Sequence, residues 1–583
     1  MHTFAVWAPD AARVDVDLHL PGGRQTLPLE VADDGWWRVA AEHARTGTDY
    51  AYRVDGGEPT PDPRSGWQPD GVHAASRVFD ADEHRPPAWP GRGARGAVFY
   101  ELHVGTFTPE GTLDAAAGHL DHLVDLGATM VSLMPVAAFP GVHGWGYDGV
   151  HLYAVHDPYG GPAALQRFVA ACHERGLGVC LDVVYNHLGP SGNHLSEFGP
   201  YFTDKHETPW GQAVNLDDEG SDQVRRWIVD NALRWFRDFG MDVLRLDAVH
   251  ELKDDSPTRM LAQLSIETAA LAAELGRPLS LVAESDLNDP RMLEPVDEGG
   301  LGMTAQWSDD FHHALHALLT GERGGYYVDF GTPQVLAKTL RQVFRHDGGF
   351  STFRGRDWGA SVDTHRHRGH AFLAYSANHD QVGNRATGDR PSATLTQGQC
   401  AIAAALVLTS PFTPMLFMGE EWGASTPWQF FTDHGEPELA ESIRTGRRRE
   451  FASHGWQAEQ VPDPQDHTTR DASVLDWAQA ADGEHSRLLA WHRQLLALRR
   501  AQPALADDDL ARVDVRWEGD ADTAGWLVVD RGVVQVVVAL SPEPQEVPFE
   551  TPVTGVLAAW GHVAPDDGLV RLDGHGVAVL TVA

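Results

Sequence analysis

Cysteine is scarce in this sequence. The chain has 583 residues but only three cysteines, Cys172, Cys180 and Cys400. An odd and sparse set in a chain of this length does not form the disulfide framework that supports many secreted proteins. We therefore expect free thiols and a reducing compartment.

Long apolar runs are missing as well. No segment approaches the roughly 20 consecutive apolar residues that a membrane-spanning helix requires. The first residues, Met1 to Ala12, lack the basic stretch followed by an apolar run that marks a secretory signal peptide. Together with the scarce cysteines, these features predict a soluble cytoplasmic protein that has no membrane partner.

Positive charge is the third deficit. The 45 Lys and Arg residues face 83 Asp and Glu residues, which gives a formal net charge of −38. Such a field repels phosphate backbones and anionic lipid surfaces, so we expect no nucleic-acid partner. The basic run from Arg444 to Glu450 is better explained as a locally salt-bridged face. A neutral partner such as a sugar is not disfavoured by this charge.

The pattern along the chain predicts three domains, because 583 residues exceed what one hydrophobic core normally holds. From Thr3 to about Phe79, short runs of alternating apolar residues separated by turn residues are typical of a β-sandwich. A proline-rich linker follows, and β-type runs return after about Asp509 to form an all-β domain. We place the domains at residues 1–90, 91–508 and 509–583.

The central segment alternates apolar runs of strand length with amphipathic helices. Pro162 suits a first helical position, and the segment from Asp222 to Phe239 carries its apolar residues on one face. This alternation predicts an α/β domain, a (β/α)8 TIM barrel with long loops. The sixth strand is the least regular of the eight. The strand-like runs begin at Ala97, Thr129, Leu177, Asp242, Leu279, Met303, Ala371 and Thr413.

Polar residues follow several of these predicted strands. In a barrel of this kind, functional side chains lie at the carboxyl ends of the strands and in the loops that follow. We therefore expect a reaction centre to form from residues at the ends of the third, fourth, fifth and seventh strands. These residues are Asp182, Asn186, His187, Arg245, Asp247, Glu284, Asn378, His379 and Asp380.

Two carboxylates in this set suit the cleavage of a glycosidic bond. Arg245 and Asp247 are two residues apart on a strand, so both point into the barrel, and the cation favours an ionised Asp247 that can attack an anomeric carbon. Glu284 follows an apolar run, and partial desolvation raises the pKa of a glutamic acid so that it can donate a proton. A separation of about 5–5.5 Å between the two carboxyl groups would imply retention of configuration.

The remaining candidates have supporting roles. A third carboxylate, Asp380, is placed to stabilise positive charge on the sugar, while His187 and His379 are expected to donate to hydroxyl groups. Trp145 and Tyr147 offer flat faces for stacking on sugar rings. Any one such group could equally belong to a structural ion pair, and Asp182 is expected mainly to orient Arg245.

Three other patterns are better explained without a cofactor or metal. The segment GWGYDG, residues 144–149, satisfies a dinucleotide-binding pattern, but no helix opens directly after it and its aromatic residues would crowd a pyrophosphate. Two histidine groups lack the spacing of a zinc site, so we expect them to be packed or solvated. They are His312, His313 and His316, and His365, His367 and His370.

Four stretches resemble, in order and position, the signature regions of the α-amylase family of glycoside hydrolases. They are DVVYNH at 182–187, LRLDAVH at 244–250, LVAES at 281–285 and SANHDQVGN at 376–384. The resemblance implies that Asp247 is the nucleophile, Glu284 the general acid/base and Asp380 the stabiliser of the transition state. It also implies that the glucose at the cleavage point contacts Tyr147, His187, Arg245 and His379.

Longer stretches, such as GWGYDGVHLYAVHDPYGGP from Gly144, resemble the members of this family that free trehalose from the end of a maltooligosyl chain. The N-terminal β module resembles the sandwich that precedes the barrel in those members and in glucan-branching enzymes. The implied reaction is hydrolysis of the α-1,4 bond next to a terminal trehalose, in trehalose biosynthesis. A synthase that forms that trehalose end from maltodextrin would act upstream, with or without a physical complex.

Alternatives remain at this stage. The same carboxylates would serve a branching enzyme or an amylase, and a glucan-binding protein without turnover is a further possibility that the intact carboxylate set argues against. We expect no cofactor. The sequence shows no dedicated calcium cage, although Asn186 stands where amylases often supply a ligand, so we also predict that no metal is required.

Overall fold

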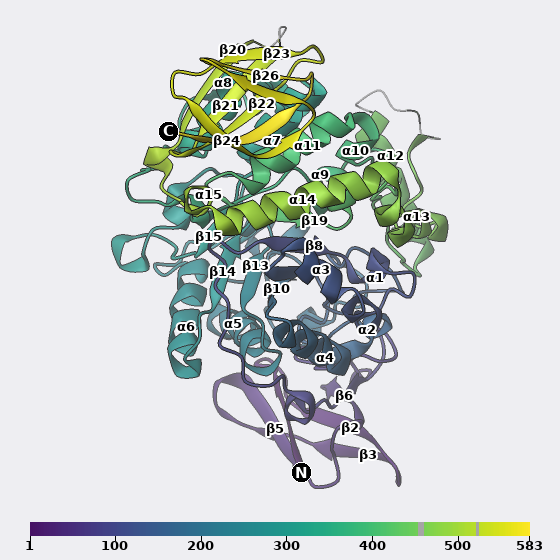
Figure 1. The fold of residues 1–583 in the computed structure, drawn as a ribbon. Coiled ribbons are helices and arrows are strands. Elements are labelled where there is room, and N and C mark those ends of the chain that lie inside the picture. Colours follow the sequence, from purple (N-terminus) through teal and green to yellow (C-terminus); the bar gives the residue numbers. More distant parts are fainter. Residues whose placement is uncertain (453–456, 458–459, 521–523) are drawn as a thin grey trace.

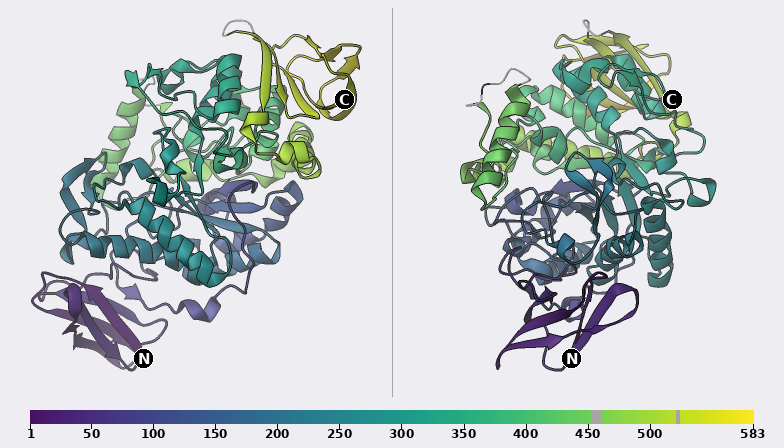
Figure 2. Two further views of the ribbon diagram at one scale, coloured as in Figure 1. Left: turned by 90° about the vertical axis from the view of Figure 1, so that its left-hand side faces the viewer. Right: turned by 180° about the vertical axis from the view of Figure 1, so that it is seen from behind.

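The protein is an elongated molecule with a barrel between two β structures. The structure is a computed structural model that describes residues 1–452, 457, 460–520 and 524–583. Figure 1 shows the N-terminal strands at one end, the barrel in the middle and the C-terminal sheets at the other end. The side views in Figure 2 show the same order, with the two chain termini at opposite ends of the molecule.

The N-terminal strands form two antiparallel sheets, which confirms the predicted sandwich. Alternate residues such as Val14, Val16 and Leu18 are fully buried between the sheets, as expected for strands with one apolar face. The three-stranded sheet has the order β1 (His2–Trp7), β5 (Trp36–Ala41), β4 (Glu30–Val31). The four-stranded sheet has the order β3 (Gly23–Pro28), β2 (Val14–Leu20), β6 (Asp49–Val54), β7 (Ser76–Arg77).

Eight parallel strands close into a barrel in chain order, so the predicted (β/α)8 fold is confirmed. All eight predicted runs contain a barrel strand, including the irregular sixth run, whose strand is only three residues long. Pairing of Met415 with Phe99 closes the ring between the last and first strands. The strands are β8 (Phe99–Leu102), β9 (Met130–Leu133), β10 (Gly178–Val183), β13 (Val243–Leu246), β14 (Ser280–Ala283), β15 (Ala305–Trp307), β18 (Phe372–Ala374) and β19 (Thr413–Phe417).

Helices cover the outside of the barrel, which explains why the strands are apolar on both faces. Both helices predicted in detail are present, as α4 and α5. Pro162 stands in the first turn of α4, and Trp227 and Trp235 lie on the buried face of α5. The principal helices of the barrel region are α3 (Leu120–Leu126), α4 (Gly161–Glu174), α5 (Ser221–Asp238), α6 (Met260–Leu275), α7 (Asp309–Thr320), α8 (Pro333–Gln342), α11 (Gln397–Leu408) and α14 (Gly483–Ala501).

The long loops predicted for the barrel contain structure of their own. A hairpin of β11 (Phe202–Thr208) and β12 (Gly211–Val214) follows β10, and a small hairpin of β16 (Phe350–Ser351) and β17 (Arg356–Asp357) follows α8. A short helix, α9 (His379–Gly383), follows β18, and α12 (Pro437–Ala452) lies in the segment after β19. The β11–β12 hairpin and α12 contribute residues to the lining of a cavity that also includes Tyr147 and His187.

The C-terminal region forms two antiparallel sheets with a core of Val, Ala and Leu side chains. The larger sheet has the order β20 (Asp514–Gly519), β21 (Ala524–Asp530), β22 (Val534–Ala539), β27 (Val577–Val582), β24 (Val553–Trp560). The smaller has the order β23 (Gln545–Pro548), β26 (Leu569–Leu572), β25 (Val563–Asp566). Arg531, between β21 and β22, donates to the carbonyl oxygen of Thr409, which joins this region to the barrel.

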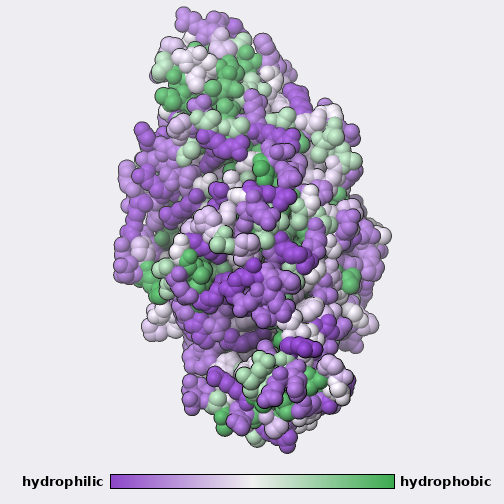
Figure 3. Space-filling view, turned by 60° about the horizontal axis from the view of Figure 1, so that its bottom comes forward, coloured by the Kyte–Doolittle hydropathy of each residue, from purple (hydrophilic) through white to green (hydrophobic). Residues whose placement is uncertain are grey.

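The surface agrees with the acidic composition. Figure 3 shows hydrophilic residues over most of the face in view, with apolar residues in scattered groups. All three cysteines carry free thiols, and two of them, Cys172 and Cys180, are buried. Among the described residues, no helix has the length and apolar character needed to span a bilayer.

Candidate active site

The carboxyl ends of the barrel strands bring three of the predicted carboxylates around one guanidinium group. Arg245 on β13 is 1% exposed. Its Nη1 donates to both oxygens of Asp182 on β10, at 2.9 and 2.8 Å, and to Oδ1 of Asp247 at 2.8 Å. Its Nη2 lies 3.7 Å from Oε2 of Glu284. The register explains the first contact, because Asp182 and Arg245 are paired residues of adjacent strands.

Asp247 is held from two sides. Arg245 donates to its Oδ1, and the Nδ2 of Asn186 donates to its Oδ2 and to its backbone oxygen, both at 2.8 Å. Two donors on one carboxylate fix its orientation. Asn186 therefore directs its amide at Asp247, and the loop after β10 contributes to the position of this carboxylate.

Glu284 is the carboxyl group best placed to keep a proton. Burial raises its pKa; Arg245 opposes this, while Asp247 and Asp380 add to it, and the result is a pKa of about 8. The backbone N–H of Ala248 donates to Oε2 of Glu284 at 2.5 Å. This N–H is aimed by a left-handed backbone at Ala248, with φ of 38°, which is an unfavourable conformation for a residue with a Cβ.

Asp380 has the opposite protonation state. Burial alone raises its pKa, but the neighbouring His379 outweighs burial and lowers the pKa to about 2. His379 Nε2 lies 3.3 Å from Oδ2 of Asp380. The site therefore contains one carboxyl that stays protonated near neutral pH and one that stays ionised, which is the division of roles that glycosidic cleavage requires.

Tyr147 connects two sides of the site. Its hydroxyl donates to Oδ2 of Asp182 at 2.6 Å and lies 2.6 Å from Nε2 of His379. Burial raises the pKa of Asp182 and Arg245 lowers it, with a resulting pKa of about 6. Because Asp182 also binds Arg245 with both oxygens, its contacts are those of a residue that orients its neighbours.

Two predicted sugar-binding residues have their polar atoms engaged within the protein. The ring nitrogens of His187 contact Oδ1 of Asn186 at 2.5 Å and the backbone oxygen of Tyr147 at 2.8 Å. Trp145 is 5% exposed, stacks on Trp428 and donates its Nε1 to a backbone oxygen. Trp145 thus supports the wall of the site from behind, whereas the predicted role was an open stacking face.

A cavity of about 570 Å³ opens beside these residues. Trp210 was not singled out from the sequence. It lies between β11 and β12, is 51% exposed, and stacks on His187 with ring centroids 4.0 Å apart. The sequence shows only a tryptophan in a segment rich in turn residues, and it does not indicate which strand end that segment approaches. The lining includes Trp145, Tyr147, His187, Phe202, Trp210, Gln212, Phe430 and Ile443.

Two further residues missed by sequence reasoning lie under the site. Trp307 on β15 packs against the guanidinium of Arg245, 4.3 Å from the ring centroid. Glu101 on β8 contacts His379. Only the third, fourth, fifth and seventh strand ends were considered from the sequence, so polar or aromatic residues on the first and sixth strands were overlooked.

The segment at 144–149 is a loop that enters the site. Gly146 has φ of 97°, and a Cβ there would lie 2.5 Å from the backbone oxygen of Pro135, so the close turn needs glycine. This turn places Trp145 and Tyr147 beside the barrel mouth. The η3 turn (Asp157–Tyr159) and then α4 follow only after an intervening stretch of loop.

The histidine groups have separate protein partners. On α7, His312 contacts His313 through their Nδ1 atoms at 3.0 Å, and His316 contacts Glu322 at 2.7 Å. In the second group, His367 contacts Glu294, and His370 faces Asp508 in the loop before the C-terminal sheets.

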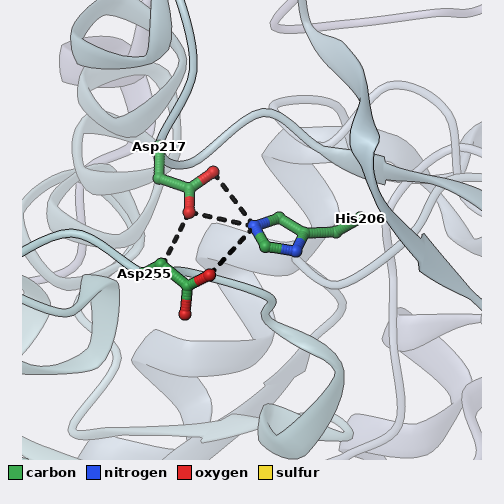
Figure 4. A group of neighbouring side chains, drawn as sticks. All are labelled: His206, Asp217 and Asp255. Carbon is green, nitrogen blue, oxygen red and sulfur yellow. Dashed lines mark hydrogen bonds and ion pairs between the residues drawn. The ribbon is translucent and has the colours of Figure 1, made fainter.

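One cluster of candidate metal ligands lies beside the β11–β12 hairpin. Figure 4 shows His206 directed at the carboxylates of Asp217 and Asp255. His206 Nε2 lies 2.9 Å from Asp217 Oδ2 and 3.8 Å from Asp255 Oδ2. Lys205 adds an ion pair to Asp217 at 3.0 Å. Within this cluster, Asp217 thus contacts both His206 and Lys205.

Comparisons with known proteins show what this chain is similar to. Residues 70–208 match the family model for the alpha amylase catalytic domain, and residues 1–67 match carbohydrate-binding module 48, the isoamylase N-terminal domain. The chain is 52% identical to the malto-oligosyltrehalose trehalohydrolase of Rhizobium sp. (strain M-11), over 98% of this chain and 95% of that protein. It is 50% identical to the malto-oligosyltrehalose trehalohydrolase of Mycobacterium tuberculosis over the whole of both chains.

A solved structure shows the same architecture. The crystal structure of a Salmonella typhimurium protein described as an alpha amylase matches with a TM-score of 0.88 at 36% sequence identity. The match covers 99% of this chain and 97% of that chain. The similarity therefore extends over the sandwich, the barrel and the C-terminal sheets. This chain belongs to the malto-oligosyltrehalose trehalohydrolase family of α-amylase-type glycoside hydrolases.

Proposed function

We propose that this protein hydrolyses the α-1,4-glucosidic bond next to the terminal trehalose unit of maltooligosyltrehalose. The products are trehalose and a maltooligosaccharide. The observation that carries this proposal is a site where Glu284 keeps its proton, Asp380 stays ionised and Asp247 is held by Arg245, in a chain that resembles trehalohydrolases from end to end. The site alone suits any retaining glycosidase, and the full-length similarity favours trehalose release over branching or amylase activity.

The proposed reaction has two steps. Glu284 donates its proton to the glycosidic oxygen while an oxygen of Asp247 attacks the anomeric carbon, so that trehalose leaves and a covalent glycosyl-Asp247 forms. Glu284 is now ionised and removes a proton from water, whose oxygen attacks the same carbon and frees Asp247. The second step returns Glu284 to its protonated form, and the maltooligosaccharide departs with its configuration retained.

The surrounding residues support both steps. Arg245 and Asn186 hold Asp247 in position, and Asp182 orients Arg245. The ionised Asp380 is proposed to stabilise the oxocarbenium-like transition state. In this proposal Tyr147, His187, Arg245 and His379 contact the glucose at the cleavage point, and Trp145 shapes the wall behind it.

The wider assignments are also proposals. Relatives with this architecture include pullulanases solved with bound maltotetraose, so the α-amylase fold accommodates glucans. We propose that the cavity lined by Trp210 and Phe430 holds part of the glucan, and that the domains divide at residues 1–90, 91–508 and 509–583. Free thiols suit a reducing compartment, and we propose that the protein acts in the cytoplasm, downstream of a synthase that forms the trehalose end.

Product analysis tests the function. The protein would be incubated with maltotriosyltrehalose, and in parallel with maltopentaose and amylose. We expect free trehalose and maltotriose from the first substrate, and far slower cleavage of the other two. Equal or faster cleavage of maltopentaose would move the function to an amylase, and new α-1,6 linkages would move it to a branching enzyme.

A further inference from the structure

The first barrel strand contributes a carboxylate that no signature region contains. Glu101 lies on β8 and is 2% exposed. Its Oε2 accepts the backbone N–H of His379 at 2.9 Å, and its Oε1 lies 2.7 Å from Nδ1 of the same residue. Both carboxylate oxygens are thus directed at His379, on the side of the ring that faces away from Tyr147.

The hydrogen bonds around His379 define where its protons are. A carboxylate only accepts, so Nδ1 must donate to Glu101. On the other side, the Tyr147 hydroxyl donates its single proton to Asp182, so it accepts from Nε2 of His379. Both ring nitrogens then carry a hydrogen, and the buried ring is cationic.

The charges that face His379 agree with a cationic ring. Burial alone lowers the pKa of His379, but Asp380 and then Glu101 outweigh burial and raise it well above the usual value. Of these two, Asp380 is on the same short helix and is engaged in the proposed chemistry. Glu101 reaches the ring from a different strand and from below.

Other charged groups packed around His379 do not replace Glu101. Asp182 on β10 has its oxygens engaged by Arg245 and Tyr147, and Arg245 on β13 is itself a cation. His103, which follows β8, is buried with a pKa lowered to about 3, so it is neutral at working pH. Glu101 is therefore the anion that can bind the Nδ1 side of the ring.

We propose that Glu101 is a positioning residue that holds the His379 ring and its positive charge in place, so that Nε2–H stays directed at Tyr147, Asp380 and the bound sugar. This rests on the proposed function, because it assigns the sugar contact to His379. Tyr147 stacks beside the ring with centroids 5.2 Å apart, and Trp145 meets it edge-on. These rings restrict the plane of His379, while Glu101 binds its Nδ1 and adds to the effect of Asp380 in favouring the protonated ring.

The test compares Glu101→Gln with Glu101→Asp. The first variant keeps the size of the side chain and removes the charge; the second keeps the charge and shortens the reach. The readout is the pH dependence of kcat for trehalose release from maltotriosyltrehalose. In the parent, Glu284 with its pKa of about 8 limits activity at alkaline pH. A neutral partner lowers the pKa of His379, so in Glu101→Gln the ring should lose its proton before Glu284 does, and activity should fall at a lower pH than in the parent.

The expected outcomes differ for the two variants. In Glu101→Gln, kcat near pH 7.5 should fall at least about tenfold, since loss of one donor to a reacting centre costs about two to three orders of magnitude. The alkaline limb of its pH profile, where kcat falls as the pH rises, should move to lower pH. In Glu101→Asp, kcat should fall but the limb should stay where the parent has it. An unchanged limb in Glu101→Gln, with only a scaled rate, would overturn the proposal.

A measurement without substrate separates this proposal from the proposed function. The ring nitrogens of His379 can be observed by 15N NMR and assigned by their loss in His379→Gln. At pH 7.5 both should be protonated in the parent, and one should lose its proton in Glu101→Gln. A parent spectrum with a neutral His379 ring would refute the proposal. This result does not depend on which glucan the protein cleaves, and it does not require that Glu101→Gln folds.

Discussion

At the scale of single residues, two carboxyl groups of the site differ in protonation although each lies close to a basic side chain, Arg245 or His379. Glu284 has a pKa of about 8, because burial and the nearby carboxylates outweigh the effect of Arg245. Asp380 has a pKa of about 2, because His379 outweighs burial. The sequence predicted which residues these are, and the packing around each explains its protonation.

The alkaline limit of activity should follow from Glu284. The first step needs its protonated form, so activity should be present below its pKa of about 8 and be lost as the pH rises through that value. The measurement is kcat/KM for maltotriosyltrehalose between pH 5 and 10. A rate that stays constant up to pH 10 would exclude Glu284 as the proton donor.

The division of labour between Asp247 and Glu284 can be tested with a substrate that needs no proton donor. On maltotriosyltrehalose, Asp247→Ala and Glu284→Gln should each lose at least about a thousandfold in kcat, since each removes a group that acts directly on the reacting bond. On α-maltotriosyl fluoride, Glu284→Gln should retain a measurable first step, while Asp247→Ala should stay inactive. Glu546→Gln, on the exposed side of the smaller C-terminal sheet, is a matched control that should behave as the parent.

At the scale of elements, the predicted strands were confirmed because their signal is local. Each is a short apolar run buried on both faces, and the eight run in chain order around the barrel. The sixth was hard to identify because β15 has three residues and pairs with β14 through only Val282 and Ala283 on that strand. The positions of the loop elements were harder to predict. Trp210 and α12 lie near the site because they contact segments that are distant in sequence.

The end of α9 provides an element-scale test of the aromatic wall. A Cβ on Gly383 would lie 2.0 Å from the Trp145 ring and 2.9 Å from Trp428 Nε1. Gly383→Ala should therefore displace the stacked pair and lower the free energy of unfolding by about 1–3 kcal/mol. Binding of glucan should weaken with it, measured as a higher KM alongside thermal unfolding.

The control for this variant is a glycine in open space. Gly446 lies within α12 with no atom near its built Cβ. Gly446→Ala should be neutral or add up to about 1 kcal/mol of stability, because alanine favours a helix over glycine. If both alanine variants had the same stability and KM as the parent, the contact of Gly383 with the wall would be unimportant.

At the scale of the whole molecule, the three regions are joined by specific contacts. Trp36 of the N-terminal module donates to Gln223 on α5, and Arg64 pairs with Asp230 on the same helix. Arg531 of the C-terminal sheets donates to the barrel carbonyl oxygen of Thr409. The sandwich and the C-terminal sheets are therefore packed on the barrel rather than linked to it by the chain alone.

Metal removal should leave the molecule active. Asn186 uses its amide to hold Asp247, and in the cluster of His206, Asp217 and Asp255 the carboxylate of Asp217 is already engaged by His206 and Lys205. We therefore expect the same kcat and the same unfolding temperature before and after dialysis against EDTA. Activity that disappears with EDTA and returns with calcium would contradict this, and Asp255→Asn would then show whether this cluster binds the ion.

The sequence by itself determined the order of sandwich, barrel and C-terminal sheets, and the identity of the carboxylates at the strand ends. These follow from local periodicity and from short motifs, each contained in a few consecutive residues. Only the tertiary structure decided that Glu101 meets His379, 278 positions away, and that Trp145 packs behind the wall while Trp210 stands in the open. Such contacts depend on how distant segments pack and on which charged groups are buried together. A local sequence pattern predicts neither of these.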